Sequence, residues 1–173
     1  LFWETDRLPG EFVSLTNKLH ALITETEEGA EVAKRSGITV PVYAAPIGID
    51  LTQWCKSSDS ISIAGVPEGN IKILYYLDWS ARKNVFDLLS AYCTEFNGTK
   101  DATLILAIPA ASPEQKGVII STVQGYLANI RVANRPAIHL ITDPLSSDHR
   151  LRLLRGADIF TVPSHGEGLD HHL

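Results

Sequence analysis

The chain has 173 residues, which is enough for one sizeable core or for one domain and part of another. Hydrophobic residues make up 45% and charged residues 20%, as is ordinary for a globular protein. The formal net charge of -5 disfavours a general nucleic-acid binder, which would carry a basic excess, so no nucleic-acid partner is expected. No apolar run is long enough for a transmembrane helix, so we expect none.

The chain starts without methionine and contains none, which suggests that it is an excised piece of a longer protein. Cys55 and Cys93 lie far apart with no Cys-x-x-Cys spacing, and we expect both to be reduced thiols. His171 and His172 are interpreted as a frayed end rather than as metal ligands, because no Cys/His spacing typical of zinc accompanies them. No metal and no bound cofactor are therefore predicted.

Apolar residues in the first third of the chain alternate between helix-like and strand-like spacing. Thr24 and Thr26 are candidate N-caps, and Glu25, Glu27 and Glu28 follow where a helix dipole favours negative charge. The expected elements are a helix over 11–19, a short buried strand over 21–24, a helix that ends near 36–37, and a strand over 40–45.

A polar and turn-rich stretch over 52–70 marks a boundary between two structural units. The elements expected after it are strand 71–77, helix 85–96, strand 103–108, helix 114–132, strand 137–141, helix 146–155 and strand 159–162. This alternation predicts right-handed strand–helix–strand units, and therefore an α/β fold with a Rossmann-like, doubly wound parallel sheet. Ligands bind such sheets at the carboxyl ends of the strands. The candidate binding loops are those after Leu77, Ile108, Ile141 and Pro163.

The first of these loops, residues 78–84, carries two adjacent cations at the start of a helix. Arg82 offers a planar fork for phosphate oxygens and Lys83 a compact charge, while the helix N-terminus adds free backbone N–H groups. Cations are unfavourable at a helix N-terminus, so a bound anion would explain their presence. Two solvated surface residues are the alternative, and the residues alone leave both interpretations open.

The last loop, residues 163–168, combines two glycines with Ser164, His165 and Glu167. This mixture suits the hydroxyl groups of a sugar, although a polar turn with a helix cap is an equal alternative. The loop over 141–145 is sufficiently explained by a turn that enters the next helix. No P-loop, Gly-x-Gly-x-x-Gly or Gly-x-Ser-x-Gly motif occurs, which weakens kinase, dehydrogenase and hydrolase interpretations.

Four segments, taken together and in this order, resemble the group 1 (family 4-like) retaining glycosyltransferases, which have the GT-B fold of two Rossmann-like domains. The four segments are AAPIGID at 44–50, DWSARKN at 78–84, GADIFTVPS at 156–164 and GEG at 166–168. The resemblance covers nearly the whole chain. It implies that residues 1–57 are the end of the acceptor-side domain with the interdomain hinge. Residues 58–173 would then be an incomplete donor-binding domain, cut off at its C-terminus.

The resemblance also assigns roles to residues. Arg82 and Lys83 match the basic motif that holds the donor diphosphate, although Tyr76-Leu77 replaces the family's Gly-Arg pair, which makes Lys83 the closer match. Glu167 matches the first glutamate of the family's paired-glutamate motif, beside the transferred sugar. Catalytic roles are thus implied for Glu167, Lys83 and Arg82. The implied donor-binding residues are Ser80, Arg82, Lys83, Asp143, Leu145, Ser164, His165, Gly166, Glu167 and Gly168.

Members of this family transfer a sugar from a nucleoside-diphosphate sugar to an acceptor with retention of configuration and without a catalytic metal. The resemblance implies that this chain is mainly the donor-binding part of such a hexosyltransferase in polysaccharide biosynthesis, inactive by itself. The implied partners are a nucleotide sugar and a saccharide or glycoconjugate acceptor, in the cytoplasm, with peripheral membrane association of a full-length enzyme as an option. The alternatives are a non-catalytic Rossmann-like binding module, and a phosphorylase or epimerase relative of the same architecture.

We also expect self-association or domain swapping, because a sheet cut after Pro163 leaves an unsatisfied edge and an exposed apolar face. Light scattering at high protein concentration should therefore give a mass above that of one chain. A monomer at every concentration would contradict this expectation.

Overall fold

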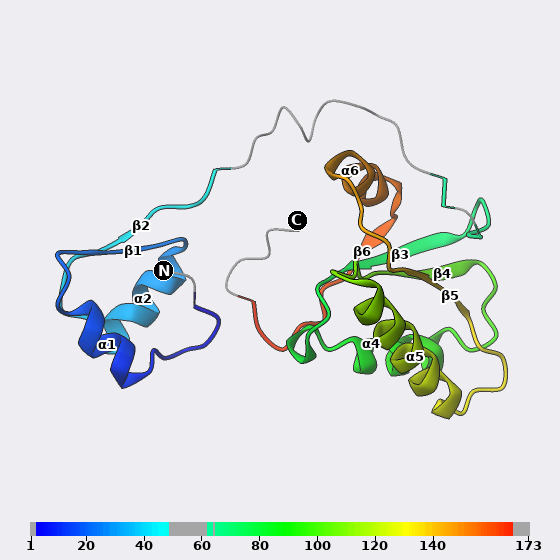
Figure 1. Ribbon diagram of the computed structural model, residues 1–173, viewed down its shortest axis with the longest axis horizontal. Coiled ribbons are helices and arrows are strands. Elements are labelled where there is room, and N and C mark those ends of the chain that lie inside the picture. The colour runs from blue at the N-terminus through cyan, green and yellow to red at the C-terminus, as the bar shows by residue number, and fades with distance from the viewer. Residues whose placement is uncertain (1–2, 49–61, 64, 168–173) are drawn as a thin grey trace. The chain divides into compact units, whose positions relative to one another are not determined.

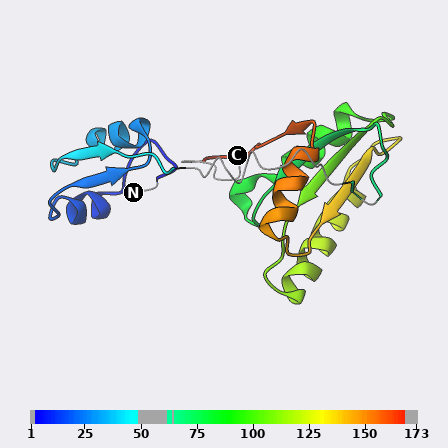
Figure 2. The same cartoon turned by 90° about the horizontal axis from the view of Figure 1, so that it is seen from above.

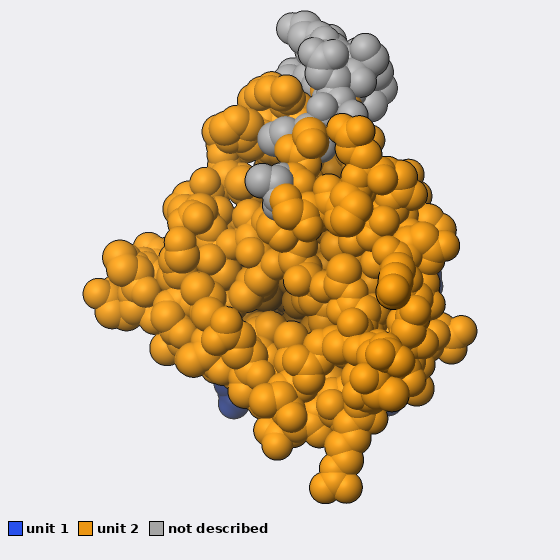
Figure 3. Space-filling view, turned by 90° about the vertical axis from the view of Figure 1, so that its right-hand side faces the viewer, with its two compact units in different colours: residues 1–51, 166–173 blue, residues 52–165 orange. Residues whose placement is uncertain are grey.

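The computed structural model describes residues 3–48, 62–63 and 65–167. The chain forms two compact units, which are coloured separately in Figure 3: residues 1–51 with 166–173, and residues 52–165. The expected domain boundary after residue 57 lies outside the described residues. Each unit is described by itself below.

The first unit pairs two short parallel strands with two helices. Its elements are α1 (Gly10–Thr16), β1 (Leu22–Thr24), α2 (Glu27–Arg35) and β2 (Val42–Ala44). Thr26 caps α2, as predicted, because its hydroxyl accepts a 2.9 Å hydrogen bond from the Gly29 amide. The helix ends at the expected place, where Gly37 takes a φ of +103° that glycine adopts at little cost.

Two expectations for this unit were wrong in detail. The helix expected over 11–19 ends at Thr16. Asn17 turns away from the helix, since its side chain donates to the Gly37 carbonyl at 3.0 Å and accepts from the Thr39 amide at 2.8 Å. The strand over 21–24 was expected to be buried, but Ile23 is 58% exposed, because only one face of β1 is covered within the unit.

The second unit contains the predicted doubly wound sheet (Figure 1). Its elements are β3 (Ile71–Tyr76), the 3-10 helix η1 (Ala81–Lys83), α4 (Val85–Glu95), β4 (Ala102–Ala107), α5 (Pro113–Asn129), β5 (Ala137–Ile141), α6 (Ser147–Gly156) and β6 (Ile159–Phe160). The strand order is β5-β4-β3-β6, and all three pairings are parallel. The α/β fold class predicted from the alternation of strands and helices is confirmed.

Helices cover both faces of this sheet. On one face, Ile73, Tyr75 and Leu104 pack with apolar residues of α4 and α5, such as Leu89 and Ile119. On the other face, the core includes Leu74, Ile105 and Leu153, the last from α6. Figure 2 looks from the side of α6, which lies in front of the strands, opposite to α4 and α5. Double burial explains why β3 and β4 are almost continuously apolar.

The topology contains one switch point. From β3 the chain runs through α4 to β4 and through α5 to β5, always outward on one side of β3. It then returns through α6 to β6 on the other side of β3. Right-handed connections that run in opposite directions place their helices on opposite faces, so the carboxyl ends of β3 and β6 form the switch point at which such sheets generally bind ligands. The loops after these two strands, which contain Lys83 and Ser164, meet there.

Several expected element ends need correction. Helix α5 stops at Asn129 rather than at residue 132, where Ile130 becomes extended and the Arg135 guanidinium donates to the Leu127 carbonyl. The last strand was expected over 159–162, but β6 ends at Phe160, shortly before Pro163, which has no N–H to donate. Cys93 is a free, buried thiol, as predicted, whereas Cys55 lies outside the described residues.

Two titratable groups on α4 give the fold a pH dependence. Burial raises the pKa of the Cys93 thiol and of the Tyr92 phenol, because desolvation disfavours their charged forms. In the unfolded chain these groups ionise at their ordinary, lower pKa values. Folding stability is therefore complete below those values and falls as the pH rises above about 8.5. Urea unfolding between pH 7 and pH 10.5 should show this fall, and a Cys93→Ala variant should show a shallower one. If the free energy of unfolding falls equally steeply with pH in both proteins, Cys93 does not contribute to the fall.

Candidate functional site

The loop after β3 buries a charged side chain. The chain leaves the sheet at Leu77 and forms the short helix η1, in which the Lys83 amide donates to the Ser80 carbonyl at 3.2 Å. Lys83 is only 3% exposed, and its ammonium lies 3.8 Å from Asp78 Oδ1, beyond hydrogen-bonding distance. Asp78 is itself 57% exposed. A buried ammonium is costly without compensation, so this lysine is not the solvated surface residue of the alternative interpretation.

Asn84 links this loop to α4 in an unusual conformation. It adopts the left-handed region with φ 52° and ψ 41°, which few residues other than glycine enter. It stands at the N-cap position of α4, but its side chain does not cap the helix. The side-chain nitrogen Nδ2 of Asn84 donates instead to the Pro163 carbonyl at 3.2 Å. The first turn of α4 therefore has N–H groups without a side-chain cap, next to the buried Lys83.

Further hydrogen bonds join the loops after β3 and β6. The His165 amide donates to the Arg82 carbonyl at 2.9 Å. The hydroxyl of Tyr75, on β3, donates to the Lys83 carbonyl at 2.7 Å and lies 3.0 Å from Ser164 Oγ. The two loops that carry most of the predicted site are thus held together at the switch point of the sheet.

The structure brings five of the predicted site residues together in the second unit. They are Ser80, Arg82, Lys83, Ser164 and His165, on the loops that follow β3 and β6. Ser80 contributes a hydroxyl oxygen that is buried without a hydrogen-bond partner, which is a donor and acceptor available to a bound molecule.

The remaining predicted residues of the last loop do not belong to this group of five. Gly166 and Glu167 are grouped with the first unit, and Gly168 lies outside the described residues. The expected place of Glu167 beside the transferred sugar therefore stays a prediction.

A second hollow lies at the same edge of the sheet, between the loops after β4 and β5. This cavity of about 380 Å³ is lined by Ala110, Ala111, Ser112, Pro113, Lys116, Thr142, Asp143 and Pro144. Asp143 forms an ion pair with Lys116 of α5. Leu145, another predicted donor-binding residue, packs against the apolar core on the α6 face, and its role stays a prediction.

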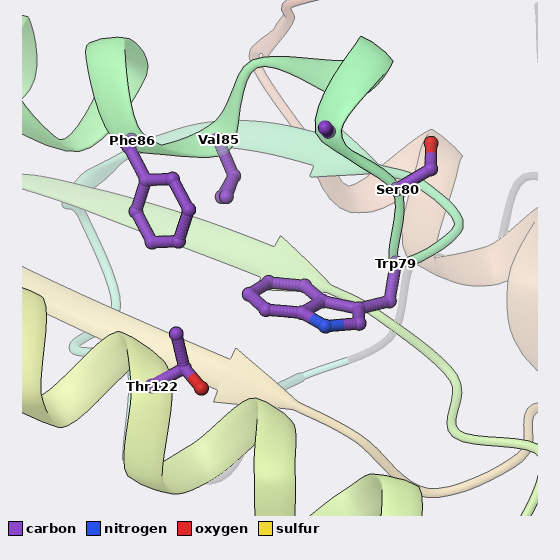
Figure 4. A pocket seen from close by; sticks show the side chains of 6 residues that line it. Trp79, Ser80, Val85, Phe86 and Thr122 are labelled. Carbon is purple, nitrogen blue, oxygen red and sulfur yellow. The ribbon is translucent and has the colours of Figure 1, made fainter.

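An aromatic pocket of about 300 Å³ adjoins the loop after β3 on the side of α4 and α5. Figure 4 shows the indole of Trp79 extending toward Phe86 and Thr122. The two aromatic rings meet edge to face with centroids 6.0 Å apart. This contact anchors Trp79, three residues before Arg82, and so limits the movement of the loop.

Sequence reasoning did not single out Tyr75, Asn84 or Lys116 as site residues. Tyr75 did carry a signal, because a tyrosine in the buried part of a strand must find a partner for its hydroxyl. The positive φ of Asn84 and the pairing of Lys116 with Asp143 depend on tertiary contacts and left no such signal.

Some kinds of site are absent from the described part of the chain. Within residues 3–48, 62–63 and 65–167, no three His, Cys, Asp or Glu side chains are grouped so that they could hold a metal ion. In the same ranges, no helix is both long and apolar enough to cross a membrane. His171 and His172 lie outside these ranges.

Solved structures similar to this chain include enzymes of trehalose metabolism. A UDP-forming α,α-trehalose-phosphate synthase from Burkholderia xenovorans aligns with a TM-score of 0.68 and 15% identity, over 94% of this chain and 44% of that chain. The corresponding enzyme from Burkholderia vietnamiensis aligns with a TM-score of 0.63 and 12% identity, over 92% of this chain and 42% of that chain. The N-terminal domain of a Candida albicans trehalose-6-phosphate phosphatase aligns with a TM-score of 0.63 and 13% identity, over 88% of this chain and 40% of that chain.

This chain spans less than half the length of each of these proteins. No protein-family model and no curated protein sequence matches it. At identities of 11–15% the likeness speaks for the fold alone. The chain therefore shares the parallel α/β fold of these solved structures.

Proposed function

We propose that this chain is mainly the nucleotide-sugar-binding part of a retaining glycosyltransferase. The observation that carries the proposal is the buried ammonium of Lys83, 3% exposed, at the switch point of the sheet and beside the N-terminus of α4. A diphosphate is the ligand class that this arrangement suits. Its negative oxygens would be attracted to the buried ammonium and accept hydrogen bonds from the first turn of the helix.

The chemistry of sugar transfer makes the same demand on the site. When the bond between the sugar and the diphosphate breaks, negative charge grows on the leaving phosphate oxygens. A cation fixed in advance stabilises that charge without having to reorganise. In this proposal Lys83 provides the fixed charge and Arg82, which is partly exposed, adds a planar fork of donors. Ser80, Ser164 and His165 complete the polar surface around the diphosphate.

The nucleoside would occupy the cavity between the loops after β4 and β5. Its volume of about 380 Å³ is within the range of small-molecule sites, and it lies at the same carboxyl edge as Lys83. Thr142 and Asp143 offer a hydroxyl and a carboxylate to a base or ribose, opposite the start of α5. UDP is a natural first probe, since two of the similar structures are described as UDP-forming synthases.

The finer parts of the proposal rest on the family resemblance. They assign Glu167, with Gly166 and Gly168, to the transferred sugar, and they assign a saccharide or glycoconjugate to the acceptor. They also divide the chain into the end of an acceptor-side domain over 1–57 and a donor-binding domain over 58–173. A non-catalytic module of the same fold would bind no nucleotide, so the following experiment separates the two functions.

Removal of the buried charge should abolish donor binding. In calorimetric titrations of UDP, GDP and ADP, one nucleotide should bind to the unaltered protein, and Lys83→Ala should weaken that binding at least tenfold. The loss of a charge-assisted hydrogen bond of about 1.5–3 kcal/mol accounts for a change of this size. Lys100→Ala is the matched control, because Lys100 is exposed and stands before the amino end of β4. If no nucleotide binds, or if both variants bind alike, the donor-site proposal fails.

Asp143 should act on the nucleoside and not on the phosphates. Asp143→Asn keeps the size of the side chain but removes its charge, so it should weaken binding of the preferred nucleoside diphosphate several-fold and leave inorganic pyrophosphate unaffected. Lys83→Ala, by contrast, should weaken both ligands. Competition titrations with pyrophosphate measure the difference. If Asp143→Asn weakens the binding of both ligands equally, Asp143 acts at the phosphates or on the folded structure, and its role at the nucleoside is refuted.

A further inference from the structure

Tyr75 is a buried polar residue in the centre of the sheet. It lies on β3, its side chain is completely buried, and its ring belongs to the core beneath α4 and α5. Packing alone would be served as well by phenylalanine. The hydroxyl, however, lies at the carboxyl edge of the sheet, 2.7 Å from the Lys83 carbonyl and 3.0 Å from Ser164 Oγ. The polar atom of this side chain thus contacts both loops of the candidate site.

The direction of these hydrogen bonds follows from the protons available. A phenol carries one proton, and the Lys83 carbonyl can only accept, so the Tyr75 proton is committed to that carbonyl. The contact with Ser164 then requires the serine hydroxyl to donate to the Tyr75 oxygen. The result is a chain from Ser164 through Tyr75 to Lys83, in which each bond polarises the next.

The Lys83 carbonyl is a sensitive point in the loop. It belongs to the peptide plane between Lys83 and Asn84, and Asn84 holds a left-handed conformation that costs free energy in a non-glycine residue. A rotation of that plane would change the direction in which the Lys83 side chain leaves the backbone. It would also move the first turn of α4, which begins at Val85. The hydrogen bond from Tyr75 opposes this rotation.

We propose that Tyr75 is a positioning residue: its hydroxyl fixes the Lys83–Asn84 peptide so that the Lys83 ammonium and the N-terminus of α4 face one diphosphate. Tyr75 itself does not touch the ligand. The inference rests on the proposed function, and it goes beyond it by giving a role to a residue of the sheet interior. It predicts that affinity for a diphosphate depends on a hydroxyl group that lies beneath the binding loop.

The test compares two tyrosines of the same core. Tyr75→Phe removes only the hydroxyl, and inorganic pyrophosphate and UDP are the probes. Their dissociation constants should rise by about threefold to tenfold, as expected when one net hydrogen bond is lost. Tyr92→Phe is the matched control. Its hydroxyl donates to the Ala137 carbonyl at 3.0 Å, at the first residue of β5 and so at the opposite end of the sheet. This control should lose comparable stability in thermal unfolding and keep its affinity.

A double-mutant cycle separates positioning from a general structural effect. If Tyr75 acts partly through Lys83, Tyr75→Phe should cause a smaller further loss of pyrophosphate affinity in a Lys83→Ala background than in the unaltered protein. A purely structural role would weaken residual binding by the same factor in both backgrounds. Ser164→Ala removes the donor to Tyr75 together with a polar group near the diphosphate, so it should weaken pyrophosphate binding in both backgrounds, but by a smaller factor in Lys83→Ala. It serves as the test if Tyr75→Phe does not fold.

The outcomes distinguish this inference from the proposed function. If the unaltered protein binds the probes and Tyr75→Phe binds them equally well, the positioning role is overturned and the donor site stays in place. The same holds if Tyr75→Phe weakens binding no more than Tyr92→Phe does. Absence of pyrophosphate and nucleotide binding in the unaltered protein overturns both. Weakening in Tyr75→Phe, but not in Tyr92→Phe, that becomes smaller in the Lys83→Ala background supports the positioning role.

Discussion

Strand β3 has hydrogen-bonded neighbours on both sides and helices on both faces, and the rest of the second unit depends on this double burial. Its side chains alternate between the two cores, with Tyr75 on the face of α4 and α5 and Leu74 on the face of α6. A fully buried polar atom on such a strand has no access to water, so it must find a partner within the protein. Tyr75 does so at the carboxyl edge, where it meets Lys83 and Ser164. The same constraint that builds the sheet therefore also ties the binding loops to it.

Burial of Lys83 is costly for the free protein. An ammonium that is 3% exposed has lost most of its hydration, and the carboxylate of Asp78, 3.8 Å away, is largely exposed. Asn84 adds an unfavourable backbone conformation next to it. Unfavourable charge and strained backbone gather at ligand sites, because the ligand supplies the missing interactions. A diphosphate would supply them at this edge of the sheet.

The similar structures show how little of this arrangement the fold itself requires. Identities of 11–15% accompany TM-scores up to 0.68, because a parallel sheet needs apolar strands and right-handed connections rather than particular residues. Unrelated functions can share such a sheet, so the fold places a switch point at β3 and β6 without saying what binds there. Lys83, Asn84 and the hydrogen bonds around Tyr75 carry that information in this chain.

The sequence by itself determined the fold class and the order of the strands and helices, and it predicted the loops that carry the candidate site. Hydrophobic spacing, the N-cap Thr26 and the adjacent cations of residues 82–83 are local properties that a linear sequence displays. The sequence did not determine the exposure of Ile23 or the short length of β6, because both depend on which neighbours cover a strand. Only the tertiary structure decided that Lys83 is buried, that Asn84 is left-handed and that Tyr75 connects Lys83 with Ser164. Tyr75 and Ser164 are 89 positions apart in the chain, and only the pairing of β3 with β6 brings them within hydrogen-bonding distance.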